Sequence, residues 1–137
     1  MADAKPPVVA ELVWFEGLRF DATSGESSAI VDGDGKAGPS PMQHAAMGLA
    51  GCMAADVIDI LRRGRHPLTG LRVTFTGIRA EMPPRRLLQI SLQFHVEGAV
   101  PPEAVERAIM LSREKYCSVW LSFRQDIELS TTFDVRP

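Results

Sequence analysis

Two cysteines, Cys52 and Cys117, are the residues of this 137-residue chain best suited to carry chemistry. They lie 65 positions apart, each among apolar neighbours in a segment whose pattern predicts a helix. This spacing fits neither a zinc motif nor the cysteine framework of a small secreted protein. It is typical of two thiols that the fold brings together, where one attacks an oxidant and the other closes a disulfide. Simple packing is the alternative, because free cysteine is among the most buried residue types.

A thiol must ionise before it attacks a peroxide, and an ordinary cysteine has a pKa of about 8.5. Cys52 lies 12 residues beyond Ser40, the predicted start of its helix, so the helix dipole is too remote to lower this pKa. Asp56, at i+4 on the same helix face, would raise it. We therefore expect a cation from elsewhere in the fold beside Cys52, with Arg19 as the first candidate and Arg124 as the second. A solvated position on a strand is the alternative for Arg19.

Cys117 falls near the predicted end of its helix, where the dipole disfavours a thiolate. This position favours Cys117 as the resolving cysteine and Cys52 as the nucleophile. The ranking would lose this support if a new helix began at Ser118.

The remaining chemistry-bearing residues give weaker signals. None of the histidines stands at metal-ligand spacing from a partner, so we expect no metal and no other cofactor. A packing or capping role is favoured for His44, near the helix start. Met42 and Met47 can line an apolar pocket, with core filling as the alternative.

Composition predicts one soluble globular domain over residues 1–137. Hydrophobic residues make up 45% of the chain, charged residues 23%, and the net charge is -2, which does not favour nucleic acid as a partner. No apolar run is expected to reach the roughly 18–20 residues that span a membrane. The stretch 1–7 lacks the apolar core of a signal peptide, so a cytoplasmic location is expected.

The residue pattern predicts an α+β fold with the order βββ-α-ββ-α-β. The clearest strand is 87–97, where apolar and polar residues alternate strictly. We expect the Gly-rich loop 32–39 to be the most mobile segment. The expected strands are 8–13, 18–22, 28–32, 71–82, 87–97 and 126–135, and the second helix begins at 101 and continues through Cys117.

The first predicted helix carries clear start and stop signals. Ser40 suits the N-cap, Pro41 the first helical position, and Gln43 completes a capping box with Ser40. The helix should run to Arg63, with Gly64 as a left-handed cap. Its first half is apolar on nearly all sides, which predicts a central helix or one that a second subunit buries.

Residues 39–43 (PSPMQ), 51–61 (GCMAADVIDIL) and 114–119 (EKYCSV) together resemble the OsmC/Ohr family. The first two stretches resemble the S-P-x-E-L-L-x-A-x-x-x-C helix of the family, and the third resembles its other cysteine motif. The order of elements agrees along nearly the whole chain. The resemblance is closest to the general OsmC-like branch rather than to the dedicated organic hydroperoxide resistance proteins.

The resemblance implies an intertwined homodimer with a long central helix from each subunit and two active sites at the interface. It also implies thiol-dependent reduction of organic hydroperoxides, with Cys52 peroxidatic and Cys117 resolving. An external dithiol would reset the pair, and a pocket that includes Met42, Gln43 and Met47 would favour organic substrates.

One departure from the family separates two interpretations. Family members commonly carry a glutamate at the helix start that orients a catalytic arginine, whereas this chain has Met42 and Gln43. Gln43 can accept a hydrogen bond but brings no charge, and charge-assisted bonds are about twice as strong. The alternative is therefore a non-catalytic protein that binds an apolar small molecule at the dimer interface. A purely structural role with inert thiols is a third reading.

Overall fold

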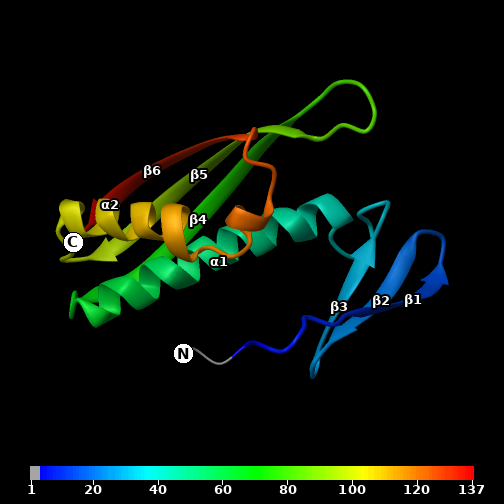
Figure 1. Cartoon of the computed structure of the whole chain (residues 1–137), viewed down its shortest axis with the longest axis horizontal. Helices are drawn as coiled ribbons and strands as arrows, with labels where there is room; N and C mark the ends of the chain where they lie inside the picture. Colours follow the sequence, from blue (N-terminus) through cyan, green and yellow to red (C-terminus); the bar gives the residue numbers. More distant parts are fainter. Residues whose placement is uncertain (1–3) are drawn as a thin grey trace. The chain divides into compact units, whose positions relative to one another are not determined.

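A computed structural model describes residues 4–137, which divide into two compact units, one up to Ala45 and one from Ala46 to Pro137. Figure 1 shows the elements of each. The first three residues of the stretch inspected for a signal peptide lie outside the described part of the chain. The single-domain organisation stays a prediction.

The first unit contains an antiparallel sheet in the order β1-β2-β3. Its strands are β1 (Glu11–Glu16), β2 (Arg19–Ser24) and β3 (Ser27–Asp32), so β1 begins and ends three residues later than expected. The connecting turns require positive φ at Gly17 (56°) and Gly25 (60°), a conformation that glycine adopts without steric cost. The meander of three short strands is confirmed.

Strand β1 exposes both of its faces in the single chain. Its four central residues are all apolar, with no polar residue between them, and each is about half exposed or more. The exposed fractions are 49% for Leu12, 57% for Val13, 66% for Trp14 and 56% for Phe15. A soluble protein rarely leaves such a patch uncovered.

The loop that follows β3 is organised around the carboxylate of Asp32. This carboxylate accepts the backbone N–H groups of Asp34 (2.9 Å), Lys36 (3.2 Å) and Ala37 (2.8 Å). The hydrogen bonds from Ala37 and Asp34 lower the pKa of Asp32. The loop predicted to be mobile therefore has a defined hydrogen-bonded core.

Helix α1 (Pro41–Arg63) begins as predicted. The Ser40 hydroxyl accepts the N–H of Gln43 at 3.1 Å, while Gln43 Oε1 accepts the N–H of Ser40 at 2.8 Å, which confirms the capping box. The predicted C-terminal cap is wrong in detail, because Arg65 rather than Gly64 takes the left-handed conformation (φ 60°). Gly64 instead lies close to the His66 side chain, because a Cβ there would be 2.9 Å from the nearest ring carbon.

Helix α1 has the predicted length, but it is more apolar overall than the sequence analysis expected. It has 23 residues and an 18-residue window of mean hydropathy 1.4, so length and composition alone would let it span a membrane. The expectation that no segment is long and apolar enough to span a membrane is therefore wrong for this helix. Its buried residues form a single line at i, i+4, i+8 and i+12, which is how a core helix packs in a globular protein. They are Leu49, Met53, Val57 and Leu61.

The second unit contains a three-stranded sheet in the order β4-β5-β6. Its strands are β4 (Leu68–Arg79), β5 (Leu87–Gly98) and β6 (Glu128–Arg136); β4 and β5 pair antiparallel, whereas β5 and β6 pair parallel. The alternation predicted for β5 is confirmed. Its fully buried residues belong to the hydrophobic core together with buried residues of α1 and α2, the helices that run along the sheet in Figure 1. They are Ile90, Leu92, Phe94 and Val96.

Helix α2 (Pro102–Leu111) is shorter than predicted and does not reach Cys117. A π-turn, η1 (Ser112–Tyr116), follows it, and a 3₁₀ turn, η2 (Trp120–Ser122), comes next. The extra residue of the π-turn is marked by the Cys117 N–H, which bonds the Ser112 carbonyl at 2.8 Å. Short π segments are rare and recur at functional sites.

Candidate functional site: a thiol pair with a carboxylate

The second unit brings the two cysteines together. The Sγ atoms of Cys52 and Cys117 and a carboxylate oxygen of Asp56 all lie within 4.8 Å of one another. Cys52 is half-buried on α1 and Cys117 is fully buried directly after η1, and both are reduced. A disulfide needs the sulfurs about 2.05 Å apart, so the side chains have to move closer together before the bond can form.

Hydrogen bonds from the segment after Cys117 converge on the two sulfurs. Cys52 Sγ lies 3.8 Å from the Ser118 hydroxyl. The Trp120 backbone N–H donates to Cys117 Sγ at 3.3 Å. Because Cys117 stands between π and 3₁₀ turns rather than inside a helix, its neighbours' N–H groups are free to point at sulfur.

The environment lowers the pKa of Cys52. Burial acts in the opposite direction and raises it, but the backbone N–H of Val119 and the thiol of Cys117 donate hydrogen bonds that favour the thiolate. The Ser118 hydroxyl adds a third such bond, while the Asp56 carboxylate opposes ionisation. The predicted opposition from Asp56 is therefore present, and donors on the facing turn outweigh it.

Burial raises the pKa of Cys117 to about 11, and the neighbouring Cys52 adds to this shift. The hydrogen bond from Trp120 lowers the pKa but does not compensate. One sulfur of the pair therefore ionises more readily than an ordinary cysteine, whereas the other holds its proton at neutral pH.

Alkylation should separate the two thiols by pH. We expect iodoacetamide to label Cys52 half-maximally at a lower pH than an ordinary cysteine, while Cys117 resists until near pH 11. Peptide mass spectrometry of protein labelled between pH 6 and 11 measures both. In urea the pH profiles of the two cysteines should coincide, because the fold causes the difference between their pKa values. Unequal profiles in urea would show that the neighbouring sequence causes it instead.

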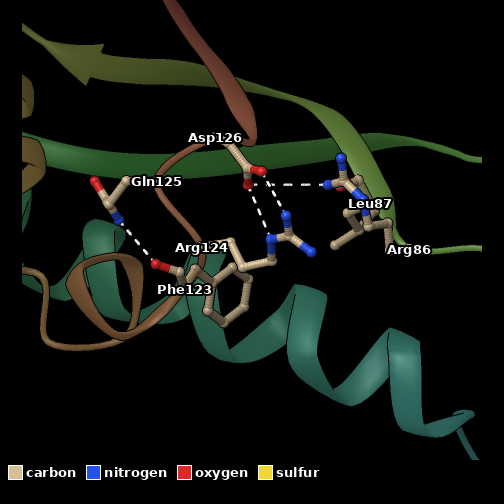
Figure 2. A network of polar contacts seen from close by, with 6 residues as sticks. All are labelled: Arg86, Leu87, Phe123, Arg124, Gln125 and Asp126. Carbon is tan, nitrogen blue, oxygen red and sulfur yellow. Dashed lines mark hydrogen bonds and ion pairs between the residues drawn. The ribbon is translucent and has the colours of Figure 1, made fainter.

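Neither candidate arginine has a direct contact with Cys52 among the described hydrogen bonds and ion pairs. Arg124 forms two hydrogen bonds with Asp126, from Nε to Oδ1 at 3.0 Å and from Nη2 to Oδ2 at 2.5 Å, and Arg86 Nη1 lies 3.9 Å from the same carboxylate (Figure 2). This network connects the segment after η2 to the residue that precedes β5. Arg19 belongs to the first unit, where it lies 4.6 Å from the centre of the Phe15 ring and 3.6 Å from Asp21.

The predicted pocket residues are divided between the units. Met47 is in the second unit with 51% of its surface exposed, whereas Met42 and Gln43 are in the first. Gln43 uses its amide oxygen in the capping box, which leaves less acceptor capacity for an arginine than the sequence suggested. His44 Nε2 lies 2.7 Å from the Ile30 carbonyl, in agreement with its expected structural role.

A hollow of about 480 Å³ lies beside Asp56 and was not foreseen. Apolar walls come from three residues, Ile60, Leu111 and Tyr116, and the Asp59–Arg63 pair closes one side. Helical spacing on α1 places the lining residues from this helix on one face, but the position of Tyr116 depends on the π-turn η1. A sequence pattern carries no signal for that turn.

The three converging atoms also meet the distance requirement for metal ligands. Two sulfurs and one carboxylate form a smaller set than the four ligands of a structural zinc site. A metal would have to displace the proton of the deeply buried Cys117 thiol. The arrangement suits thiol chemistry better, and the absence of a metal stays a prediction.

The chain belongs to the OsmC-like protein family, whose model matches residues 33–132. It is 37% identical over 129 residues to the protein YhfA of Escherichia coli strain K12, an alignment that covers 92% of this chain and 96% of that protein. A hypothetical protein from Aquifex aeolicus VF5 has the same fold, with a TM-score of 0.90, 24% identity and coverage of 96% and 98%. An organic hydroperoxide resistance protein OsmC from Legionella pneumophila also shares it, with a TM-score of 0.68, 14% identity and coverage of 97% and 100%.

These likenesses confirm the family predicted from the two cysteine motifs and the βββ-α-ββ-α-β order of an α+β fold. They also support the assignment of α1 as the core helix of a soluble OsmC-like protein. The family includes proteins named for organic hydroperoxide resistance, which bears on the chemistry proposed below.

Proposed function

We propose that this protein is a thiol peroxidase that reduces organic hydroperoxides through Cys52 and Cys117. The observation that carries the proposal is the approach of the two sulfurs to within 4.8 Å with opposite pKa shifts. A nucleophile must be a thiolate near neutral pH, whereas a resolving thiol can wait in its protonated form.

The proposed cycle has three steps. The Cys52 thiolate attacks the peroxide oxygen, the O–O bond breaks, and the alkoxide leaves as an alcohol after it takes a proton. The Cys52 sulfenic acid then condenses with the Cys117 thiol to form a disulfide and water. An external dithiol reduces this disulfide and restores both thiols.

Arg19 stays our candidate for the cation beside Cys52, where it would also stabilise the departing oxygen. Its Nε is buried and has no hydrogen-bond partner within residues 4–137. A guanidinium with an unused donor can bind an oxyanion. The proposed pocket residues Met42, Gln43 and Met47 would hold the organic part of the substrate.

We also propose that the functional form is a homodimer. The exposed apolar side chains of β1, together with the exposed face of α1 at Met47, are surfaces that a monomer would leave in water. A second copy of the chain would bury them, as a central helix that is apolar on nearly all sides requires.

The proposed function predicts sustained consumption of cumene hydroperoxide by the reduced protein in the presence of dithiothreitol. We expect the rate to exceed that with hydrogen peroxide by about 10-fold, since burying roughly 55 Å² of apolar substrate surface contributes about 1.4 kcal/mol. Residual peroxide is measured over time at pH 7, with a blank that contains dithiothreitol alone. Consumption no faster than the blank would contradict the proposal.

The hollow beside Asp56 favours one alternative function, the binding of a small molecule with an apolar part. Its walls are mixed, because Asp56, Asp59 and Arg63 stand beside the apolar residues. Ligand-dependent thermal stabilisation in a protein whose thiols ignore peroxide would favour this alternative.

A further inference from the structure

The Asp56 carboxylate disfavours the first step of the proposed cycle, which needs the Cys52 thiolate. It lies at i+4 from Cys52 on α1, within 4.8 Å of both sulfurs, and it opposes ionisation of Cys52. A negative charge beside a nucleophilic thiolate disfavours the reactive form. Its position therefore calls for a role in a different step.

A hydrogen bond from a buried serine holds this carboxylate in place. The Ser112 hydroxyl, which has no exposed surface, donates to Asp56 Oδ2 at 2.7 Å. A carboxylate has about four acceptor sites, so the bond fixes its position and leaves acceptor capacity toward the sulfurs.

The π-turn links this hydrogen bond to the resolving cysteine. Ser112 opens η1, and its carbonyl accepts the Cys117 N–H at 2.8 Å where the turn ends. One local structure therefore sets both the hydroxyl that orients Asp56 and the thiol that faces it. An ordinary α-helical turn would bond the N–H of Tyr116, not that of Cys117, to this carbonyl.

The resolving step needs a proton acceptor at this place. With a pKa of about 11, only about one Cys117 in ten thousand is a thiolate at pH 7. A positioned base removes this limitation and contributes typically 10²- to 10⁴-fold. Such a base acts from hydrogen-bond distance or through one water, which a separation of at most 4.8 Å allows.

We propose that Asp56 transfers the proton in the disulfide-forming step, an inference that depends on the proposed peroxidase function. As Cys117 Sγ attacks the sulfenic sulfur of Cys52, Asp56 accepts the Cys117 proton. The S–S bond forms, the S–O bond of the sulfenic acid breaks, and Asp56 returns the proton to the departing hydroxide, which leaves as water. Asp56 ends unchanged. In this step the Cys117 sulfur is oxidised and the sulfenic sulfur of Cys52 is reduced, so that both reach the disulfide level, while the oxygen leaves as water without a change of oxidation state.

The titratable surroundings of Asp56 are few among the described residues. Cys52 faces it from α1, and Cys117 and Tyr116 face it from the end of η1. Asp59 and Arg63 also line the hollow, and they pair with each other at 3.0 Å. A pH profile of the resolving step therefore reports chiefly on the two thiols.

Single-turnover measurements on the full chain test this role. One equivalent of cumene hydroperoxide is added between pH 6 and 9, dimedone traps the sulfenic acid, and intact mass follows disulfide formation. For the native protein we expect a nearly flat rate of disulfide formation. For Asp56→Asn we expect this rate to fall about 100-fold at pH 7 and to rise about tenfold per pH unit as direct ionisation of Cys117 takes over. Formation of the sulfenic acid should be as fast as in the native protein or faster.

Glu114→Gln is the matched control, because it removes one negative charge from an exposed position on the same π-turn. It should leave both steps and their pH profiles unchanged. Disulfide formation by Asp56→Asn at the native rate, or a tenfold rise per pH unit in the native protein itself, would overturn the role of Asp56. The pH profile of the native protein tests the role even if the Asp56→Asn variant fails to fold. Formation of neither sulfenic acid nor disulfide in the native protein would instead overturn the peroxidase function.

Discussion

Cys52→Ser is expected to abolish hydroperoxide consumption, with a residual rate at least roughly 1,000-fold below that of the native protein. Serine keeps the shape of the side chain but replaces a thiol of lowered pKa by an alcohol that does not ionise near neutral pH. The fold should survive, because Cys52 is only half-buried and its contact with Ser118 is a weak one at 3.8 Å. Peroxide consumption with dithiothreitol measures the effect.

Cys117→Ser is the matched control, since it removes the other sulfur of the pair. This variant should still consume one equivalent of hydroperoxide, stop at the Cys52 sulfenic acid and form no intramolecular disulfide. Dimedone labelling at Cys52 with no loss of a second thiol identifies that state. Undiminished turnover by Cys52→Ser would contradict the assigned roles. So would the reverse pattern, in which Cys117→Ser is not oxidised and dimedone labels Cys117 in Cys52→Ser.

Leu12→Glu is expected to convert the protein from a dimer to a monomer. Leu12 lies on β1, half exposed in the single chain, beside three further exposed apolar residues, Val13, Trp14 and Phe15. In a monomer the substitution should change stability by no more than about 0.5 kcal/mol. In a two-fold dimer it enters the interface twice, so a loss of about 2 kcal/mol per site raises Kd roughly 1,000-fold.

Ser28→Glu is the control, because it adds the same charge at an exposed polar position of the same sheet. Light scattering coupled to size-exclusion chromatography at about 10 µM should give a dimer for the native protein and the control, and a monomer for Leu12→Glu. A native protein that elutes as a monomer, or a Leu12→Glu variant that stays dimeric, would contradict the proposed use of β1.

Local patterns predicted the elements whose stability comes from neighbouring residues. The capping box of Ser40 and Gln43 depends on residues three positions apart, and the structure contains both hydrogen bonds. The alternation in β5 depends on one buried and one exposed face, and the burial pattern follows it. Both features leave a local pattern of residue types in the sequence, which is why the sequence alone was sufficient to predict them.

The site was predictable in its thiols but not in what surrounds them. The motifs around Cys52 and Cys117 selected the two residues, and Asp56 was noted for its effect on Cys52. The end of α2 at Leu111 and the π-turn after it were missed, because apolar residues keep helical spacing up to Cys117. As a result the Val119 N–H, which favours the Cys52 thiolate, was not foreseen, and a distant cation was invoked to supply the whole effect.

The central claim is that Cys52 and Cys117 form a redox pair, and intact mass with a free-thiol count tests it most directly. The reduced native protein is mixed with one equivalent of cumene hydroperoxide at pH 7. We predict rapid loss of both thiols and a mass decrease of about 2 Da, the signature of one intramolecular disulfide. Two thiols that remain unreacted at unchanged mass would contradict the claim.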